Sequence, residues 1–173
     1  MKLKKLVSAV TALGVVAALC ASLSGCGEKK SDKYKVGICQ LAQHEALDAA
    51  TQGFKDALKE KLGDKVTFDE QNAAGEPATC TTIVNQFVSG KVDLIFANAT
   101  GALQAAVSAT DSIPIVGTSV TDYATALEMK DWSGKTGINV TGTSDLAPLD
   151  KQAEMFKELL PNATKGGILD CSG

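Results

Sequence analysis

Polar side chains follow the predicted strands of this sequence, and two of them have the chemistry to bind a zwitterion. Thr100 stands shortly after an apolar run that ends at Ala97, at the start of a predicted helix that its hydroxyl is placed to cap. The free N–H groups and the dipole of that helix start favour a carboxylate. Asp122 follows the next predicted strand and suits an ammonium group. The pair fits a free amino acid, and the alternative is that both residues are ordinary caps and turn residues.

Further amides, hydroxyls and acids lie in the same segments after the strands. These segments are rich in hydrogen-bonding groups and poor in catalytic ones. In open α/β sheets, ligands bind at the carboxyl ends of the strands. We therefore predict a ligand-binding site formed by Gln43, Asn98, Thr100, Ser119, Asp122 and Asp145.

Catalytic patterns are weak in this sequence. His44 is the one histidine, and without an ordered Ser or Cys partner it makes no triad, so we expect it at the surface or at the rim of the site, with a ligand contact left open. Residues 133–136 are similar to the end of a phosphate-binding loop, but Met129 occupies the place of the required glycine, and the segment precedes a predicted strand. No metal-ligand spacing is visible. We expect no enzyme activity, no cofactor and no metal.

Short apolar stretches alternate with amphipathic ones from residue 34 onward. The spacing of apolar residues predicts a helix over 45–62 that ends at Gly63, and Pro77 marks the start of another. The nearly continuous apolar run 92–97 predicts a strand that is covered on both faces. The other expected elements are strands at 36–39, 66–68 and 113–117, an edge strand at 136–140, helices at 101–109 and 148–160, and a strand that opens at 167–169.

Repeated strand–helix cycles of this length are typical of right-handed βαβ units. The predicted fold class is therefore α/β, with an open parallel sheet. The chain of 173 residues is long enough for one domain with a real hydrophobic core.

The first residues have the pattern of an export signal, with three early lysines, an apolar run and small residues before Cys26. A transmembrane helix is the alternative, but the run is near the lower length limit and does not end in basic residues. Residues 23–26, Leu-Ser-Gly-Cys, resemble the bacterial lipobox. That resemblance implies a signal peptide over 1–25 and a lipid on Cys26, and we expect 26–33 to be a polar tether.

Charge and cysteine content exclude two further classes of protein. The formal net charge is −3 and no cluster of basic residues follows the tether, which argues against nucleic-acid binding. Cys39, Cys80 and Cys171 are odd in number and far apart in sequence, so they form neither a disulfide framework nor a zinc pattern. Two of them can pair in an oxidising exterior, but we expect packed, reduced thiols. The sequence alone leaves their redox state open.

Five features in a fixed order carry a resemblance to a known family. They are the lipobox, YKVGICQLAQHEALDAATQGFKDAL, DLIFANATGALQAA, IPIVGTSVTDYATA and GINVTGTSDL. Together they resemble the substrate-binding lipoproteins of ABC importers, and more narrowly the family that includes tryptophan- and tyrosine-type amino-acid binders. No single motif is diagnostic, but the resemblance covers nearly all of residues 34–173.

The resemblance implies a type I periplasmic-binding-protein-like fold, in which two Rossmann-like lobes close around a small ligand. On that basis we expect a first lobe over residues 34–141. Residues 142–173 are then expected to cross the hinge and begin the second lobe. The sequence would thus be part of a protein roughly twice as long, as two such lobes require.

The resemblance also implies a function outside the cytoplasm. We expect a solute-binding lipoprotein, held to the cell membrane by the lipid on Cys26, that captures a small polar ligand and delivers it to the permease and ATPase subunits of an ABC importer. The ligand is expected to be an amino acid, aromatic ones included. Two alternatives stay open, namely a lipid-anchored sensory or scaffold module that binds a partner protein, and a sugar or nucleoside receptor. Tyr123 is the one aromatic residue at a predicted strand end, which disfavours the sugar receptor.

Overall fold

The computed structural model of the protein describes residues 33–167. The predicted signal peptide, Cys26 with most of its tether, Cys171 and all but the first residue of the strand predicted at 167–169 lie outside the described residues. Within residues 33–167, no helix combines the length and the apolar character needed to cross a bilayer.

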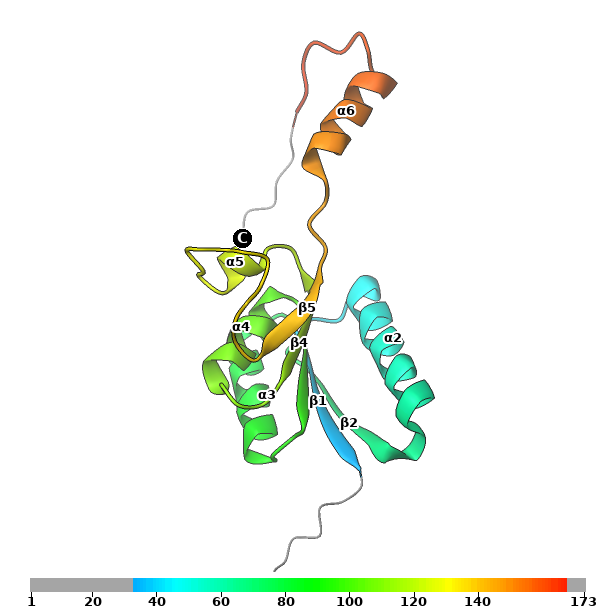
Figure 1. The fold of residues 1–173 in the computed structure, drawn as a ribbon. Helices are drawn as coiled ribbons and strands as arrows, with labels where there is room; N and C mark the ends of the chain where they lie inside the picture. Colours follow the sequence, from blue (N-terminus) through cyan, green and yellow to red (C-terminus); the bar gives the residue numbers. More distant parts are fainter. Residues whose placement is uncertain (1–32, 168–173) are drawn as a thin grey trace, which may run out of the picture. The chain divides into compact units, whose positions relative to one another are not determined.

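Five parallel strands form one sheet in the order β2-β1-β3-β4-β5 (Figure 1). The α/β class with a parallel sheet is thus confirmed. The strands are β1 (Tyr34–Gln40), β2 (Val66–Asn72), β3 (Leu94–Asn98), β4 (Ile115–Val120) and β5 (Val140–Ser144). The helices are α2 (Glu45–Leu62), α3 (Pro77–Ser89), α4 (Thr100–Ala109), α5 (Tyr123–Ala126) and α6 (Leu149–Leu159), with a short 3-10 helix η1 (Gly63–Lys65).

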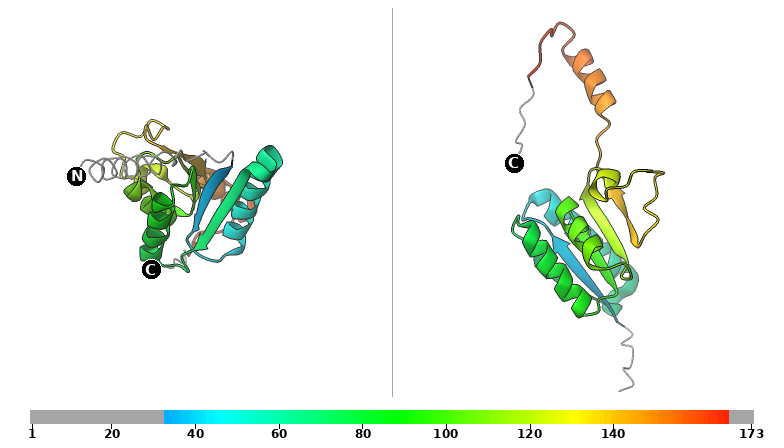
Figure 2. Two further views of the ribbon diagram at one scale, coloured as in Figure 1. Left: turned by 90° about the horizontal axis from the view of Figure 1, so that it is seen from below. Right: turned by 90° about the vertical axis from the view of Figure 1, so that its left-hand side faces the viewer.

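Helices cover both faces of the sheet, α2 on one side and α3 with α4 on the other (Figures 1 and 2). Alternate residues of each strand face opposite layers, as strand geometry requires. On β3, Phe96 belongs to the core beneath α2, where it stacks on Phe54 at a ring-centroid distance of 3.9 Å. Its neighbours Ile95 and Ala97 belong to the larger core beneath α3 and α4. This double coverage explains why the sequence of β3 is almost continuously apolar.

The helix predictions from periodicity and end signals are confirmed. The helix predicted over 45–62 has those bounds, with Gly63 as its C-cap residue, and the helix marked by Pro77 begins there. Strands β2 and β4 run on to Asn72 and Val120, beyond the predicted strand ends. The four-residue helix α5 was not predicted.

The predicted edge strand at 136–140 is wrong, because β5 begins at Val140 and runs to Ser144. Side-chain bonds hold the preceding segment in a loop. The Nδ2 atom of Asn139 donates to the carbonyl oxygens of Thr110 and Ile113, at 3.2 and 2.7 Å. The Oγ1 atom of Thr136 donates to the carbonyl oxygen of Val140. The backbone therefore enters the sheet at Val140, the residue that follows this bonded loop.

Helix α6 exposes its apolar side chains in the described part of the chain. Leu149, Phe156 and Leu159 are exposed by 66%, 62% and 67%. None of its residues is buried. The helix is amphipathic, so this apolar stripe is the kind that other elements cover in a folded protein.

A close approach in the larger core leads to a stability prediction. A Cβ atom at Gly37 of β1 would lie 2.6 Å from the ring of Phe87 in α3. We expect Gly37→Ala to lower the free energy of unfolding by about 1–3 kcal/mol, because the ring or the strand must shift. Gly53→Ala is the matched control, since it meets nothing within 4 Å on α2 and should stabilise by about 0.5–1 kcal/mol. Denaturant unfolding of both variants checks this, and equal effects would contradict it.

A polar site at the carboxyl ends of the strands

Backbone hydrogen bonds bring the ends of three strands and their loops side by side. The N–H of Leu41, after β1, donates to the carbonyl oxygen of Asn98 at the end of β3, at 3.1 Å. The N–H of Ala99 donates to the carbonyl oxygen of Thr118 in β4, at 2.9 Å. Three of the predicted site residues therefore lie at this edge of the sheet: Asn98 ends β3, Thr100 begins α4 shortly after it, and Ser119 lies near the end of β4.

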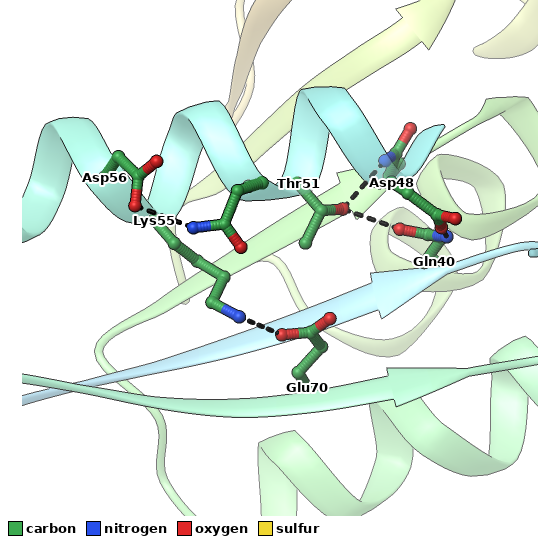
Figure 3. A network of polar contacts seen from close by, with 8 residues as sticks. Gln40, Asp48, Thr51, Lys55, Asp56 and Glu70 are labelled. Atoms are coloured by element: carbon green, nitrogen blue, oxygen red, sulfur yellow. Dashed lines mark hydrogen bonds and ion pairs between the residues drawn. The ribbon is translucent and has the colours of Figure 1, made fainter. Parts of the chain in front are cut away.

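A buried chain of side-chain hydrogen bonds runs beneath this edge (Figure 3). Thr51 of α2 donates through Oγ1 to Oε1 of Gln40 at 2.7 Å, and Nδ2 of Asn98 donates to that Oγ1 at 2.9 Å. The same Nδ2 donates to the carbonyl oxygen of Leu47 at 2.8 Å. Gln40 donates through Nε2 to Oδ1 of Asp48 at 2.6 Å. These bonds join α2 to the ends of β1 and β3.

Asn98 thus has a structural task within the lobe. Its side chain is fully buried, and its NH₂ group is taken up by Thr51 and Leu47. Its Oδ1 atom is the one buried side-chain polar atom without a partner among the described residues. Buried polar atoms are nearly always hydrogen-bonded to protein or water. The Oδ1 atom of Asn98 is therefore the one acceptor of this network that a further donor could fill.

The turn from β3 into α4 corrects the prediction for Thr100. Helix α4 begins at Thr100, so this residue lies inside the first turn, and its hydroxyl does not cap the helix. The cap position is Ala99, whose φ of 94° and ψ of 158° fall in a region that residues with a Cβ rarely adopt. Bonds on both sides hold it there, from its N–H to Thr118 and from the N–H of Leu103 to its carbonyl. The first N–H groups of α4 have no intrahelical acceptor, as at any helix start.

Ser119 lies at an irregularity of β4 rather than after the strand. The register pairs Gly117 with Gly142 and then Val120 with Ser144, so β4 has one extra residue between the two pairs. Ser119 has a φ of 55°, the left-handed conformation that such bulges use. Its side chain is half-buried. Bulges re-aim side chains at the edges of sheets, and this one lies beside the carboxyl end of β3.

Asp122 caps the short helix α5. Its Oδ1 accepts from the N–H of Ala124 at 2.9 Å, and its Oδ2 accepts from Oγ1 of Thr125 at 2.6 Å. The hydrogen bond from Thr125 is the main cause that lowers the pKa of the Asp122 carboxyl, and the N–H of Ala124 adds to it. The carboxylate is exposed and charged at neutral pH, so it keeps unfilled acceptor positions for a cation.

The end of β5 brings Asp145 to the same side of β4. The N–H of Asp145 donates to the carbonyl oxygen of Val120 at 3.2 Å, and Ser144 donates through Oγ to the carbonyl oxygen of Thr121. Tyr123 is buried beside them and donates its hydroxyl to the carbonyl oxygen of Thr143 at 3.2 Å. Burial raises the pKa of Tyr123, and the charge of Asp145 adds to this effect. The strand end at β4 is therefore flanked by two carboxylates.

The remaining predicted residue, Gln43, lies exposed in the loop between β1 and α2. The next residue, His44, is the N-cap of α2, and its Nδ1 atom accepts from the N–H of Ala46 at 3.2 Å. This capping contact agrees with an exposed position for the histidine. A histidine is an unusual N-cap, which is why the sequence did not indicate this role.

A cavity of about 420 Å³ lies along β5, apart from the six predicted residues. Tyr123, Trp132, Lys135 and Ser144 contribute to its wall, together with the loop before β5. No pattern in the sequence indicates this cavity, because its wall joins a loop and an edge strand that meet only in the folded chain. No three side chains of His, Cys, Asp or Glu are close enough to hold a metal anywhere in the described residues.

These features define a class of protein. At the carboxyl ends of its central strands, an open parallel sheet carries strained backbone at Ala99 and Ser119 and polar side chains beside them. Among residues 33–167, no nucleophile and base are hydrogen-bonded to each other there. In open α/β sheets, that edge is where small ligands bind. The arrangement is that of a small-molecule-binding α/β lobe.

The chain belongs to the family of ABC transporter substrate binding proteins. The family model with that description matches residues 35–173. A curated relative, a tyrosine-binding protein of Clostridioides difficile, is 41% identical over an alignment of 186 positions, gaps included, that covers 97% of this chain and 52% of the relative. The chain thus spans about half the length of the curated relative that it matches.

Solved structures give the same result. A domain from Streptococcus pneumonia in complex with L-Trp is 36% identical, with a TM-score of 0.68 over 75% of this chain and 44% of that one. A ligand-free, open substrate binding protein with adhesive properties from Clostridium difficile is 42% identical, with the same TM-score and the same coverage. A leucine binding protein from Thermotoga maritima shares the fold at 16% identity and a TM-score of 0.54. The match to a type I periplasmic-binding-protein lobe is therefore confirmed.

The buried network leads to a prediction for Thr51. Thr51→Val keeps the shape of the side chain but leaves Oε1 of Gln40 and one N–H of Asn98 without partners in the core. We expect the free energy of unfolding to fall by about 2 kcal/mol or more. Thr82→Val is the matched control, because the hydroxyl of Thr82 is exposed and only bonds to Ala78 in its own helix. Urea denaturation of the two variants checks this, and a similar small loss in both would show that the network adds little.

Proposed function

We propose that the protein is a solute-binding receptor that captures an amino acid, of the aromatic type, for an ABC importer. The observation that carries the proposal is the juxtaposition, at one sheet edge, of the free N–H groups of α4 with the carboxylates of Asp122 and Asp145. A helix start favours a carboxylate, and an exposed carboxylate favours an ammonium group. The relatives named for tyrosine and bound to L-Trp support this ligand class.

The ligand groups are assigned to the predicted residues. The first turn of α4, at Thr100, receives the ligand carboxylate. Asp122 receives the ammonium group, with Asp145 close by. Ser119 and Gln43 supply further hydrogen bonds from the bulge of β4 and from the β1–α2 loop. The free Oδ1 of Asn98 accepts a hydrogen bond from the ligand or from a water molecule, because it has no partner among the described residues.

The same proposal covers location and partners. The protein acts outside the cytoplasm, where a lipid on Cys26 holds it to the membrane beside the permease and ATPase subunits. Such tethering raises the local concentration of receptor at the permease. The receptor catalyses no reaction, because its task is to bind and release.

We propose that the chain leaves this lobe after β5 and leads into a second one, to which α6 belongs. The exposed apolar stripe of α6 supports this assignment, since Leu149, Phe156 and Leu159 have no cover in the described residues. Closure of two lobes on a ligand buries more of its surface than one lobe does.

Calorimetric titration of the mature protein from its native cell, stripped of bound ligand, tests the function directly. We expect L-tyrosine or L-tryptophan to bind at least a hundredfold more tightly than a hexose or a nucleoside, because only an amino acid has both charged groups. Binding of a sugar or nucleoside alone would replace the proposal by that receptor class. Binding of none of them would favour the sensory or scaffold module.

The role of Asp122 is tested by removing its charge alone. Asp122→Asn keeps a side-chain oxygen that caps α5, so the fold should be preserved. We expect amino-acid affinity to fall more than tenfold, because the ammonium group loses its counter-ion. Asp111→Asn, in the exposed loop before β4, is the control and should leave affinity unchanged. Unchanged affinity in Asp122→Asn would remove this assignment.

A further inference from the structure

The structure brings together two of the three cysteines that the sequence left unassigned. Cys39 and Cys80 are free thiols, each with no exposed surface, and both lie in the larger hydrophobic core. Each thiol also acts on the pKa of the other through a side-chain hydrogen bond. Packing geometry supports this, because Gly37 shares a face of β1 with Cys39 and lies against the ring of Phe87 in α3, the helix that carries Cys80. Both cysteines therefore stand where α3 packs on β1, although 40 residues of sequence separate them.

Their positions link two different elements of the lobe. Cys39 is the next-to-last residue of β1 and pairs with Ala97 of β3 in the sheet register. Cys80 lies in the first turn of α3, where its N–H donates to the carbonyl oxygen of Glu76. A bond between them would join the strand that ends at the candidate site to the helix that packs over it.

We propose that Cys39 and Cys80 form a disulfide in the exported protein. This inference rests on the proposed extracytoplasmic location, because disulfides form and persist in oxidising compartments outside the cytoplasm. The sequence left such a pairing open beside the expectation of packed, reduced thiols, because it could not show which cysteines share a core.

The oxidant is a disulfide-bearing molecule or protein. One cysteine thiolate attacks the oxidant disulfide and forms a mixed disulfide, which releases one oxidant thiol. The second cysteine thiolate then attacks the mixed disulfide, forms the Cys39–Cys80 bond and releases the second oxidant thiol. The two cysteines lose two electrons, the oxidant disulfide gains them, and the two thiol protons pass to the released thiols.

Burial decides when this exchange takes place. Burial is the main cause that raises the pKa of both thiols in the folded lobe, so neither supplies a reactive thiolate there. The exchange therefore occurs while the exported chain folds, before the core closes around Cys39. Once closed, the same burial shields the bond from reductants.

Peptide mapping of the mature protein tests the bond. Trypsin releases Cys39 in the peptide 36–55 and Cys80 in the peptide 66–91. Protein taken from the native cell surface and blocked at once with an alkylating reagent should give these two peptides covalently linked before reduction. Two separately alkylated peptides, or a link from either cysteine to Cys171, would overturn the proposal.

A refolding experiment makes the test independent of location. The reduced, unfolded protein is refolded with mixed oxidised and reduced glutathione, and its Tm is measured with and without dithiothreitol. The oxidised form should melt about 5 °C or more above the reduced form, because the bond closes a long loop of the unfolded chain. Cys80→Ala should abolish this difference and Cys171→Ala should keep it. An oxidised form that melts at or below the reduced form would overturn the proposal.

The outcome is separable from that of the proposed function. Amino-acid binding with both thiols free would overturn the disulfide and leave the receptor function standing. A linked pair in a protein that binds no amino acid would support the disulfide and remove the receptor function.

Discussion

The lobe depends on a buried chain of hydrogen bonds that joins Gln40, Thr51 and Asn98. Each of these side chains is almost fully buried, and a buried polar group without a partner costs about 1–3 kcal/mol. Apolar contacts alone would allow α2 to slide along the sheet, because the hydrophobic effect has no direction. The three-way bonding fixes one register of α2 against β1 and β3 (Figure 3).

The register of α2 also fixes the position of the strand ends at the carboxyl edge of the sheet. The side chain of Asn98, at the end of β3, is bonded to α2 on one face of the sheet. The next residue, Ala99, is bonded through its N–H to β4, and it adopts a strained conformation at the start of α4. Strain of this kind costs about 1–3 kcal/mol and persists only when its surroundings hold it. The bulge at Ser119 lies on the adjoining strand. A rigid polar edge of this kind lets a receptor bind a small ligand with little loss of its own conformational freedom.

Local signals explain what the sequence predicted well. Helix α2 has its predicted bounds because the apolar period and Gly63 both lie within the segment itself. Long-range bonds explain the errors. The side chain of Asn139 holds the segment before β5 in a loop, and the backbone bond from Ala99 to Thr118 holds Ala99, rather than Thr100, at the cap position of α4. Residue types were enough to predict which residues form the candidate site. They could not show that Asn98 is committed to holding α2, that Asp122 caps α5, or that Cys39 and Cys80 share one core, because each of these facts belongs to pairs distant in sequence or to an unpredicted helix.

The most direct measurement of the central claim is hydrogen–deuterium exchange of the mature protein with and without the proposed amino-acid ligand. If the carboxyl edge of the sheet is the binding surface, the ligand slows exchange of the amides over residues 99–102 and 119–122, where the first turn of α4 and the end of β4 lie. Slowed exchange confined to the loop at 131–139, beside the β5 cavity, would contradict the account. Exchange that the ligand leaves unchanged at both places would contradict it as well.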